Sequence, residues 1–258
     1  MKALYTPASS AQIHVFDMSQ VPWQATANPG LLLKPVRLDD AQGHFLGLVK
    51  FEAFARSGLH QHQGLATSFV IDGGLTDYHG AIKMHEAGLN FKGATHDAIS
   101  YQNTLLVSRL EAPVSYPPNS NISGVHAGSE YKSFENPDPA VPPEVNVAVD
   151  QLPVASTGYP GVGRQMIYDY TGAAHARRYA QLSIQPHTHF EFEASAVTEF
   201  WVRGGNLAIN GLDAFANCFI VCEAKAKVVI DSPFGAMLLV WAEGPEKACE
   251  RSKSLFGF

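Results

Sequence analysis

The sequence predicts an all-β protein built from two tandem barrels. Short segments rich in Val, Ile, Leu and aromatic residues recur along the 258 residues, and glycine, proline or Asp/Asn interrupts them at about the spacing expected of a barrel or sandwich. Helical periodicity is scarce. In addition, a series of landmarks recurs at a fixed distance, which indicates two copies of one unit.

The expected strands are apolar runs that end at turn-forming residues. In the first half, the run 68–71 ends just before Gly73-Gly74, and in the second half the run 199–202 ends just before Gly204-Gly205. The full set of expected strands, in chain order, is 31–37, 45–54, 68–71, 99–110, 178–184, 199–202, 219–223, 228–230 and 236–241.

The repeat is defined by proline and glycine landmarks. Pro22 is followed by Pro29-Gly30, and Pro153 is followed at the same spacing by Pro160-Gly161, so both landmarks recur at one common offset. A histidine pair follows in each half, His60/His62 and His187/His189. We therefore expect one copy of the unit over residues 1–114 and a second over 144–258, and the resemblance described below implies an N-terminal barrel with a metal site and a C-terminal, degenerate barrel.

The segment 115–143 separates the two copies. Its prolines include Pro117-Pro118 and Pro142-Pro143, and asparagine and glycine lie between them. Proline and turn residues at this density cannot continue a strand ladder, so we expect a proline-rich linker.

Composition excludes several classes of function. Charged residues make up 16% of the chain, the net charge is −6 and no Lys/Arg run occurs, so neither nucleic acid nor an anionic membrane is expected as a partner. Met1 to Gln20 lacks the features of a secretory signal, and no apolar run approaches the roughly 18 residues of a membrane span, so we expect a cytoplasmic protein. The three cysteines, an odd number, argue against a disulfide framework, and Cys218 and Cys222 are expected to be buried thiols.

Three histidines of the first half form a candidate metal site. On a strand, His60 and His62 point to the same face about 6.6 Å apart. His96 follows the turn residue Gly93 and could lie on a neighbouring strand. Neutral imidazoles bind transition metals at about 2.1 Å, so three converging rings would leave open positions for substrate. An exposed polar pair is the alternative for a His-x-His motif alone.

The His-x-His pair, the strand ending in glycine and the later Gly-x-x-His resemble the two motifs of the cupins, jelly-roll barrels with a metal in the barrel mouth. The stretch from His60 to His96 resembles the cupin domain of the anti-sigma factor ChrR. The lead-in, with Val21-Pro22-Trp23 and Lys34-Pro35, is similar to that of dihydroxyacetophenone and acetylacetone-cleaving dioxygenases. The resemblance covers about 13–112 well and 145–245 weakly, and it implies a bicupin.

The resemblance implies His60, His62 and His96 as metal ligands. Many cupins have a glutamate four residues after the second histidine, but here Ala66 occupies this position, which leaves an all-histidine triad. For the pocket we consider Thr67, Phe69, Tyr101 and Gln102, although core packing is the alternative for Phe69 and Tyr101.

The second barrel could hold a second metal. His187 and His189 would then act with a carboxylate from Glu193 or Glu199, a two-histidine-one-carboxylate set. Val228 aligns with the third histidine of the first barrel, which favours a structural barrel instead.

The function implied by the resemblance is a non-haem metal dioxygenase that cleaves a C–C bond of a small β-diketone or hydroxyketone with O2. The cofactor would be a divalent transition metal, iron for an enzyme, with zinc or nickel as alternatives. The alternative function is a non-catalytic, ChrR-like metal- or ligand-sensing module. The expected partner is a small-molecule substrate, and the sequence leaves open whether the protein forms a homodimer.

Overall fold

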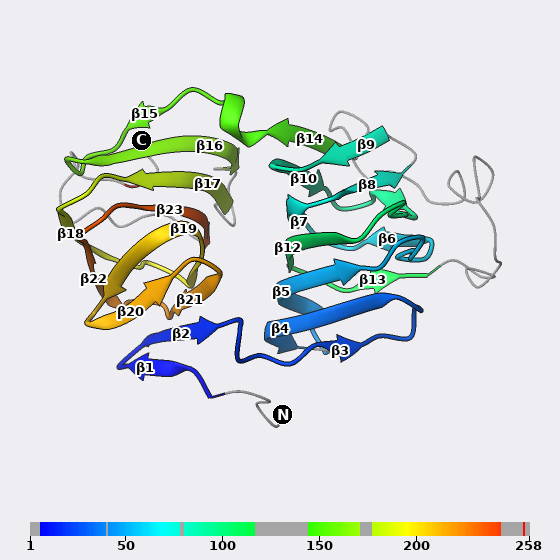
Figure 1. Cartoon of the computed structure of the whole chain (residues 1–258), viewed down its shortest axis with the longest axis horizontal. Coiled ribbons are helices and arrows are strands. Elements are labelled where there is room, and N and C mark those ends of the chain that lie inside the picture. Colours follow the sequence, from blue (N-terminus) through cyan, green and yellow to red (C-terminus); the bar gives the residue numbers. More distant parts are fainter. Residues whose placement is uncertain are drawn as a thin grey trace. The chain divides into compact units, whose positions relative to one another are not determined.

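The computed structural model describes residues 6–39, 41–77, 80–116, 144–170 and 177–243, together with Leu255. The chain forms two compact units, the first barrel (Trp23–Asp150) and the second barrel (Met1–Pro22 with Gln151–Phe258). The elements of the described residues are strands, apart from the 3-10 helix η2 (Val149–Gln151). The expected all-β fold of two jelly-roll barrels is confirmed (Figure 1).

The first barrel has a seven-stranded antiparallel sheet in the order β14-β10-β7-β12-β5-β4-β3. A three-stranded sheet, β11-β6-β13, carries the histidines, and β8 pairs with β9. The bounds in chain order are β3 Gln24–Ala25, β4 Leu31–Asp39, β5 His44–Phe51, β6 His60–His62, β7 Ala66–Asp72, β8 Gly74–Asp77, β9 Gly80–Lys83, β10 Glu86–Asn90, β11 Thr95–His96, β12 Thr104–Leu110, β13 Val114–Ser115 and β14 Glu144–Ala148.

The second barrel is an eleven-stranded sheet with the main path β1-β2-β21-β19-β23-β17-β16-β15. Off this path, β18 pairs with β22, and both β20 and β22 pair with β19. The bounds are β1 Ala8–Ser10, β2 Ile13–Asp17, β15 Ala155–Ser156, β16 Val162–Tyr170, β17 Arg177–Ile184, β18 Thr188–Glu193, β19 Thr198–Ile209, β20 Leu212–Phe215, β21 Cys218–Cys222, β22 Lys227–Ser232 and β23 Ala236–Glu243.

The two copies repeat strand for strand. Strands β2, β3 and β4 begin at positions 13, 24 and 31, and β14, β15 and β16 begin at 144, 155 and 162, so one common offset relates the two series. The first strand of each copy is exchanged between the barrels. Strand β2 pairs with β21 of the second barrel, and β14 pairs with β10 of the first (Figure 1).

This exchange corrects the expected domain boundaries of 1–114 and 144–258. Residues 1–22 belong with the second barrel, and the first barrel extends to residue 150. The physical reason is edge protection: β10 and β21 would otherwise expose a row of unpaired backbone groups. The expected linker lies outside the described residues from 117 to 143.

Several expected strand ends also differ. The run 45–54 ends as a strand at Phe51, and the run 99–110 becomes a strand only at Thr104. Ser100 lies in a tight turn in which its hydroxyl donates to the Gln102 carbonyl at 2.5 Å, and this turn prevents an earlier start. Cys218 and Cys222 are buried free thiols, as expected. No helix with the length and apolar character needed to span a bilayer occurs in the described part of the chain.

The interiors of the two barrels differ. The second barrel is filled by a large apolar cluster in which Phe200, Val202 and Leu238 are fully buried, and β2 contributes Ile13 and Val15 to it. In the first barrel, Phe45, Val49 and Leu106 belong to an apolar cluster, and they also line a cavity.

Candidate metal centre

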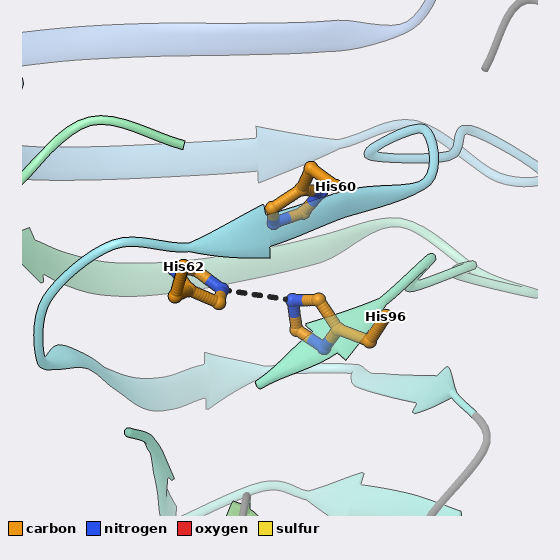
Figure 2. A group of neighbouring side chains, drawn as sticks. All are labelled: His60, His62 and His96. Carbon is orange, nitrogen blue, oxygen red and sulfur yellow. Dashed lines mark hydrogen bonds between the residues drawn. The ribbon is translucent and has the colours of Figure 1, made fainter. Parts of the chain in front are cut away.

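Three histidines converge inside the first barrel (Figure 2). His60 and His62 lie on one face of β6, with ring centroids 4.8 Å apart, because side chains two residues apart on a strand share a face. Strand β11 pairs with β6 and places His96 directly opposite His60. One ring nitrogen from each lies within 4.8 Å of the others, and all three side chains are buried.

The turn before β11 fixes the third histidine. Gly93 has φ +93°, a conformation that glycine adopts without strain. Its N–H donates to the His62 carbonyl at 2.8 Å, and the His62 N–H donates to the Ala94 carbonyl at 2.9 Å. These two bonds hold β11 against β6, so the glycine turn predicted from the sequence acts as expected.

The outer nitrogens of two of the rings have hydrogen-bond partners. His60 Nδ1 lies 2.7 Å from the Gly58 carbonyl. His96 Nδ1 lies 3.1 Å from Asp77 Oδ2 and 2.8 Å from Glu144 Oε1. Because carbonyl and carboxylate oxygens accept hydrogen bonds, Nδ1 carries the proton in both rings. The Nε2 atoms are thereby directed to the centre of the site.

The three rings differ in charge. Burial lowers the pKa of the His60 imidazole to about 3, with the charge of His96 adding to the effect and the bond to Gly58 opposing it. Burial, then His60 and His96, lower the pKa of His62 well below its usual value. Burial would also lower the pKa of His96, but the hydrogen bonds and charges of Asp77 and Glu144 outweigh it and raise this pKa to about 9.

The donor set fits a transition metal. His62 Nε2 and His96 Nε2 lie 3.1 Å apart. Two nitrogens about 2.1 Å from one ion, at the angles of octahedral or tetrahedral coordination, lie about 3.0 to 3.4 Å apart. Ala66 and Thr67 supply no carboxylate next to the triad, so the three converging groups are all imidazoles.

The triad opens into a cavity of about 810 Å³ within the first barrel. Of the four residues considered for the pocket, only Thr67 lines it. Phe69 is buried and stacks on the ring of His85. Tyr101 is 60% exposed and contacts Phe54 edge-on, and Gln102 is exposed in the turn before β12. Phe69, Tyr101 and Gln102 are therefore not among the residues that line this cavity, and Tyr101 and Gln102 lie before β12 because that strand starts only at Thr104.

The candidate ligands of the second barrel are not brought together. His187 and His189 are exposed, and His189 Nδ1 pairs with Asp231 at 2.6 Å. Glu199 is buried, and Glu193 is half-buried at the end of β18. Among the described residues, no group of metal-ligating side chains includes any of these four.

Backbone bonds identify the positions that truly correspond to the triad. The bond between the His62 N–H and the Ala94 carbonyl recurs between the Ala194 N–H and the Ala226 carbonyl. Ala194 and Ala226 each lie the same number of positions after His62 and Ala94. The same separation in the chain relates His60 to Phe192 and His96 to Val228. Phe192 pairs with Val228 as His60 pairs with His96. The triad is thus replaced by Phe192, Ala194 and Val228, which pack in the apolar core.

Sequence reasoning missed the two carboxylates on His96. Asp77, at the end of β8, is 19 residues from His96, whereas Glu144 is much further along the chain, on the exchanged strand β14. Asp77 lies within the stretch that resembles the ChrR cupin, which is a weak signal. No local pattern indicates Glu144, because its place depends on the pairing of β14 with β10.

The two jelly-roll barrels have the fold of the cupins, and the first of them holds converging histidines in its interior. More particularly, residues 11–114 match the model of the ChrR cupin-like domain. No curated protein sequence matches the chain.

Solved structures support the fold at low identity. A candidate dioxygenase from Nostoc punctiforme has a TM-score of 0.71 and 12% identity, over 96% of this chain and 87% of that one. YlbA from Escherichia coli has a TM-score of 0.66 and 9% identity, over 91% and 93%. An oxalate decarboxylase mutant from Bacillus subtilis has a TM-score of 0.58 and 12% identity, over 89% and 78%.

Proposed function

We propose that the first barrel is a metal-dependent dioxygenase that cleaves a C–C bond of a β-diketone or hydroxyketone with O2. The observation that carries the proposal is the convergence of the three Nε2 atoms of His60, His62 and His96 at a cavity of the first barrel. Three protein ligands leave open positions for a chelating substrate. The similarity to the candidate dioxygenase from Nostoc punctiforme supports this class of reaction.

The metal, iron in this proposal, would polarise the substrate oxygens and activate O2. The protein residues have three tasks. His60, His62 and His96 hold the ion, and Asp77 and Glu144 hold the His96 ring. Because the three ligands are neutral when they bind a metal, the centre keeps a positive charge that favours the anionic enolate of the substrate.

The apolar wall of the cavity excludes water from the reacting carbon. Phe45, Val49 and Leu106 contribute to this wall. A dry pocket strengthens the electrostatic attraction between the centre and the enolate, and it protects the enolate from protonation by water.

The test is metal content together with O2 uptake, measured on the full chain with a panel of β-diketones and hydroxyketones. We expect about one metal per chain and ketone-dependent O2 uptake, both lost in His96→Ala. The matched control is His189→Ala, an exposed histidine of the second barrel, which should change neither. Absence of ketone-dependent O2 uptake from iron-loaded protein would reject the enzyme.

A non-catalytic metal- or ligand-sensing module is the second candidate. The match of residues 11–114 to the ChrR cupin-like domain favours it. For this candidate we expect metal binding that depends on His96 and ligand binding to the loaded protein, without O2 uptake for any ketone of the panel.

A further inference from the structure

The cavity of the first barrel is much larger than a small diketone. Its volume of about 810 Å³ compares with roughly 150 Å³ for a cavity that holds one benzene molecule. It is also long, since His44 and Phe51, at the two ends of β5, both line it. Seven steps along a strand, at about 3.3 Å each, correspond to about 23 Å.

The inner face of the large sheet forms an apolar floor with a shallow middle row. On one side Leu110 pairs with Phe45, and on the other Leu106 pairs with Val49. Between them Ser108 pairs with Gly47 on β5 and with Ser68 on β7. Large apolar side chains thus flank Ser108 and Ser68, which line the cavity, whereas the space over Gly47 is filled by the Lys34 carbonyl.

Three polar residues border this space. Asn90, which is 8% exposed, lines the cavity, and Ser68 and Ser108 line it on the floor.

We propose that the substrate of the first barrel carries an extended alkyl or acyl chain. Its oxygen atoms would lie at the histidine triad, and its alkyl chain would lie along Ser68 and Ser108, between the apolar rows. The assignment of the oxygens to the triad rests on the function proposed above, whereas the place of the chain rests on the cavity alone.

The first experiment is calorimetric titration of the metal-loaded full chain with acetohydroxamate, hexanohydroxamate and decanohydroxamate, bidentate oxygen chelators of increasing length. Burial of a methylene group strengthens binding about fourfold. We expect the Kd to fall by about this factor per methylene until the chain fills the cavity. A Kd that does not change with chain length would overturn the proposal.

Two variants test where the alkyl chain binds. Ser108→Leu and, independently, Ser68→Leu each place a branched side chain where a serine lines the cavity. Each should remove most of the gain between acetohydroxamate and decanohydroxamate, with metal content and acetohydroxamate affinity retained. The control Lys83→Leu adds an apolar side chain at an exposed position of β9 and should retain the gain. An unchanged gain in both serine variants would also overturn the proposal.

Metal-free protein separates this inference from the proposed function. Hexanol, octanol and decanol carry no chelating group. We expect them to bind the metal-free protein with the same dependence of the Kd on alkyl-chain length. If the protein binds no metal but the alkanol series shows this dependence, the dioxygenase proposal fails and the proposed alkyl-chain site stands. If metal binding and O2 uptake are observed but neither probe series depends on length, only the alkyl-chain site is rejected.

Discussion

At the scale of residues, His96 differs from the other two histidines of the triad. His60 and His62 have lowered pKa values, mainly because they are buried, whereas two carboxylates raise the pKa of His96 to about 9. A carboxylate on the outer nitrogen of a metal-binding imidazole fixes the ring and makes it a stronger ligand. Asp77 and Glu144 are therefore positioning residues for the proposed metal.

Asp77→Asn and Glu144→Gln should each weaken metal binding by about 10- to 100-fold, the usual effect of removing such a partner. The measurement is competition with a chromophoric chelator on the full chain. Asp231→Asn is the control, because Asp231 makes the same kind of contact with the exposed His189. Unchanged affinity in both carboxylate variants would show that the ring of His96 is fixed in another way.

The exposed pair of His189 and Asp231 provides a pH-dependent test. The hydrogen bond and the charge of Asp231 raise the pKa of His189 above 6.5. A raised folded-state pKa means that the pair stabilises the fold below the unfolded-state pKa and that this contribution is lost as pH rises through the raised value. In an NMR titration, Asp231→Asn should bring the pKa of His189 back towards 6.5, and an unchanged titration would contradict the pairing.

At the scale of elements, the first strand of each repeat copy stabilises the barrel formed by the other copy. Ile13 lies on β2, in the first copy of the repeat, yet its side chain is 1% exposed within the core of the second barrel. Strand β14 makes the reciprocal contribution to the first barrel through its pairing with β10.

Ile13→Ala should therefore destabilise the second barrel by about 2 to 5 kcal/mol, the cost of such a truncation in a packed core. Hydrogen exchange on the full chain should show lost protection in β21, which pairs with β2. The amides of β5 and β12 in the first barrel should be unaffected. The control is His14→Ala on the same strand, at a half-buried position. Lost protection confined to the first barrel would contradict the exchange.

At the scale of the whole molecule, the exchange determines which fragment of the chain can fold. Residues 23–150 contain all strands of the first barrel, including β14, whereas residues 1–114 lack β14 and retain β1 and β2 without their partner β21. The natural boundary is therefore set by strand pairing.

We expect the fragment 23–150 to unfold cooperatively on heating and the fragment 1–114 to unfold at a lower temperature or without a cooperative transition. Circular dichroism at a strand wavelength gives the measurement. Equal melting temperatures for the two fragments would contradict the contribution of β14.

Much of this molecule can be predicted from its sequence. The strands, the repeat and the joint orientation of His60 and His62 depend on residue alternation and turn residues, which are local properties of the chain. The same local information is misleading at His187 and His189, because a His-x-His pair does not specify its register, and the structure places Phe192 and Ala194 at the equivalent positions.

The sequence by itself determined the fold class, the twofold repeat and the three histidines of the candidate centre. Only the tertiary structure decided which barrel receives each exchanged strand, which carboxylates reach His96, and how large the cavity is. The physical reason is that these features depend on contacts between segments far apart in the chain. The register of strand pairing, which no local pattern specifies, determines which of those segments meet.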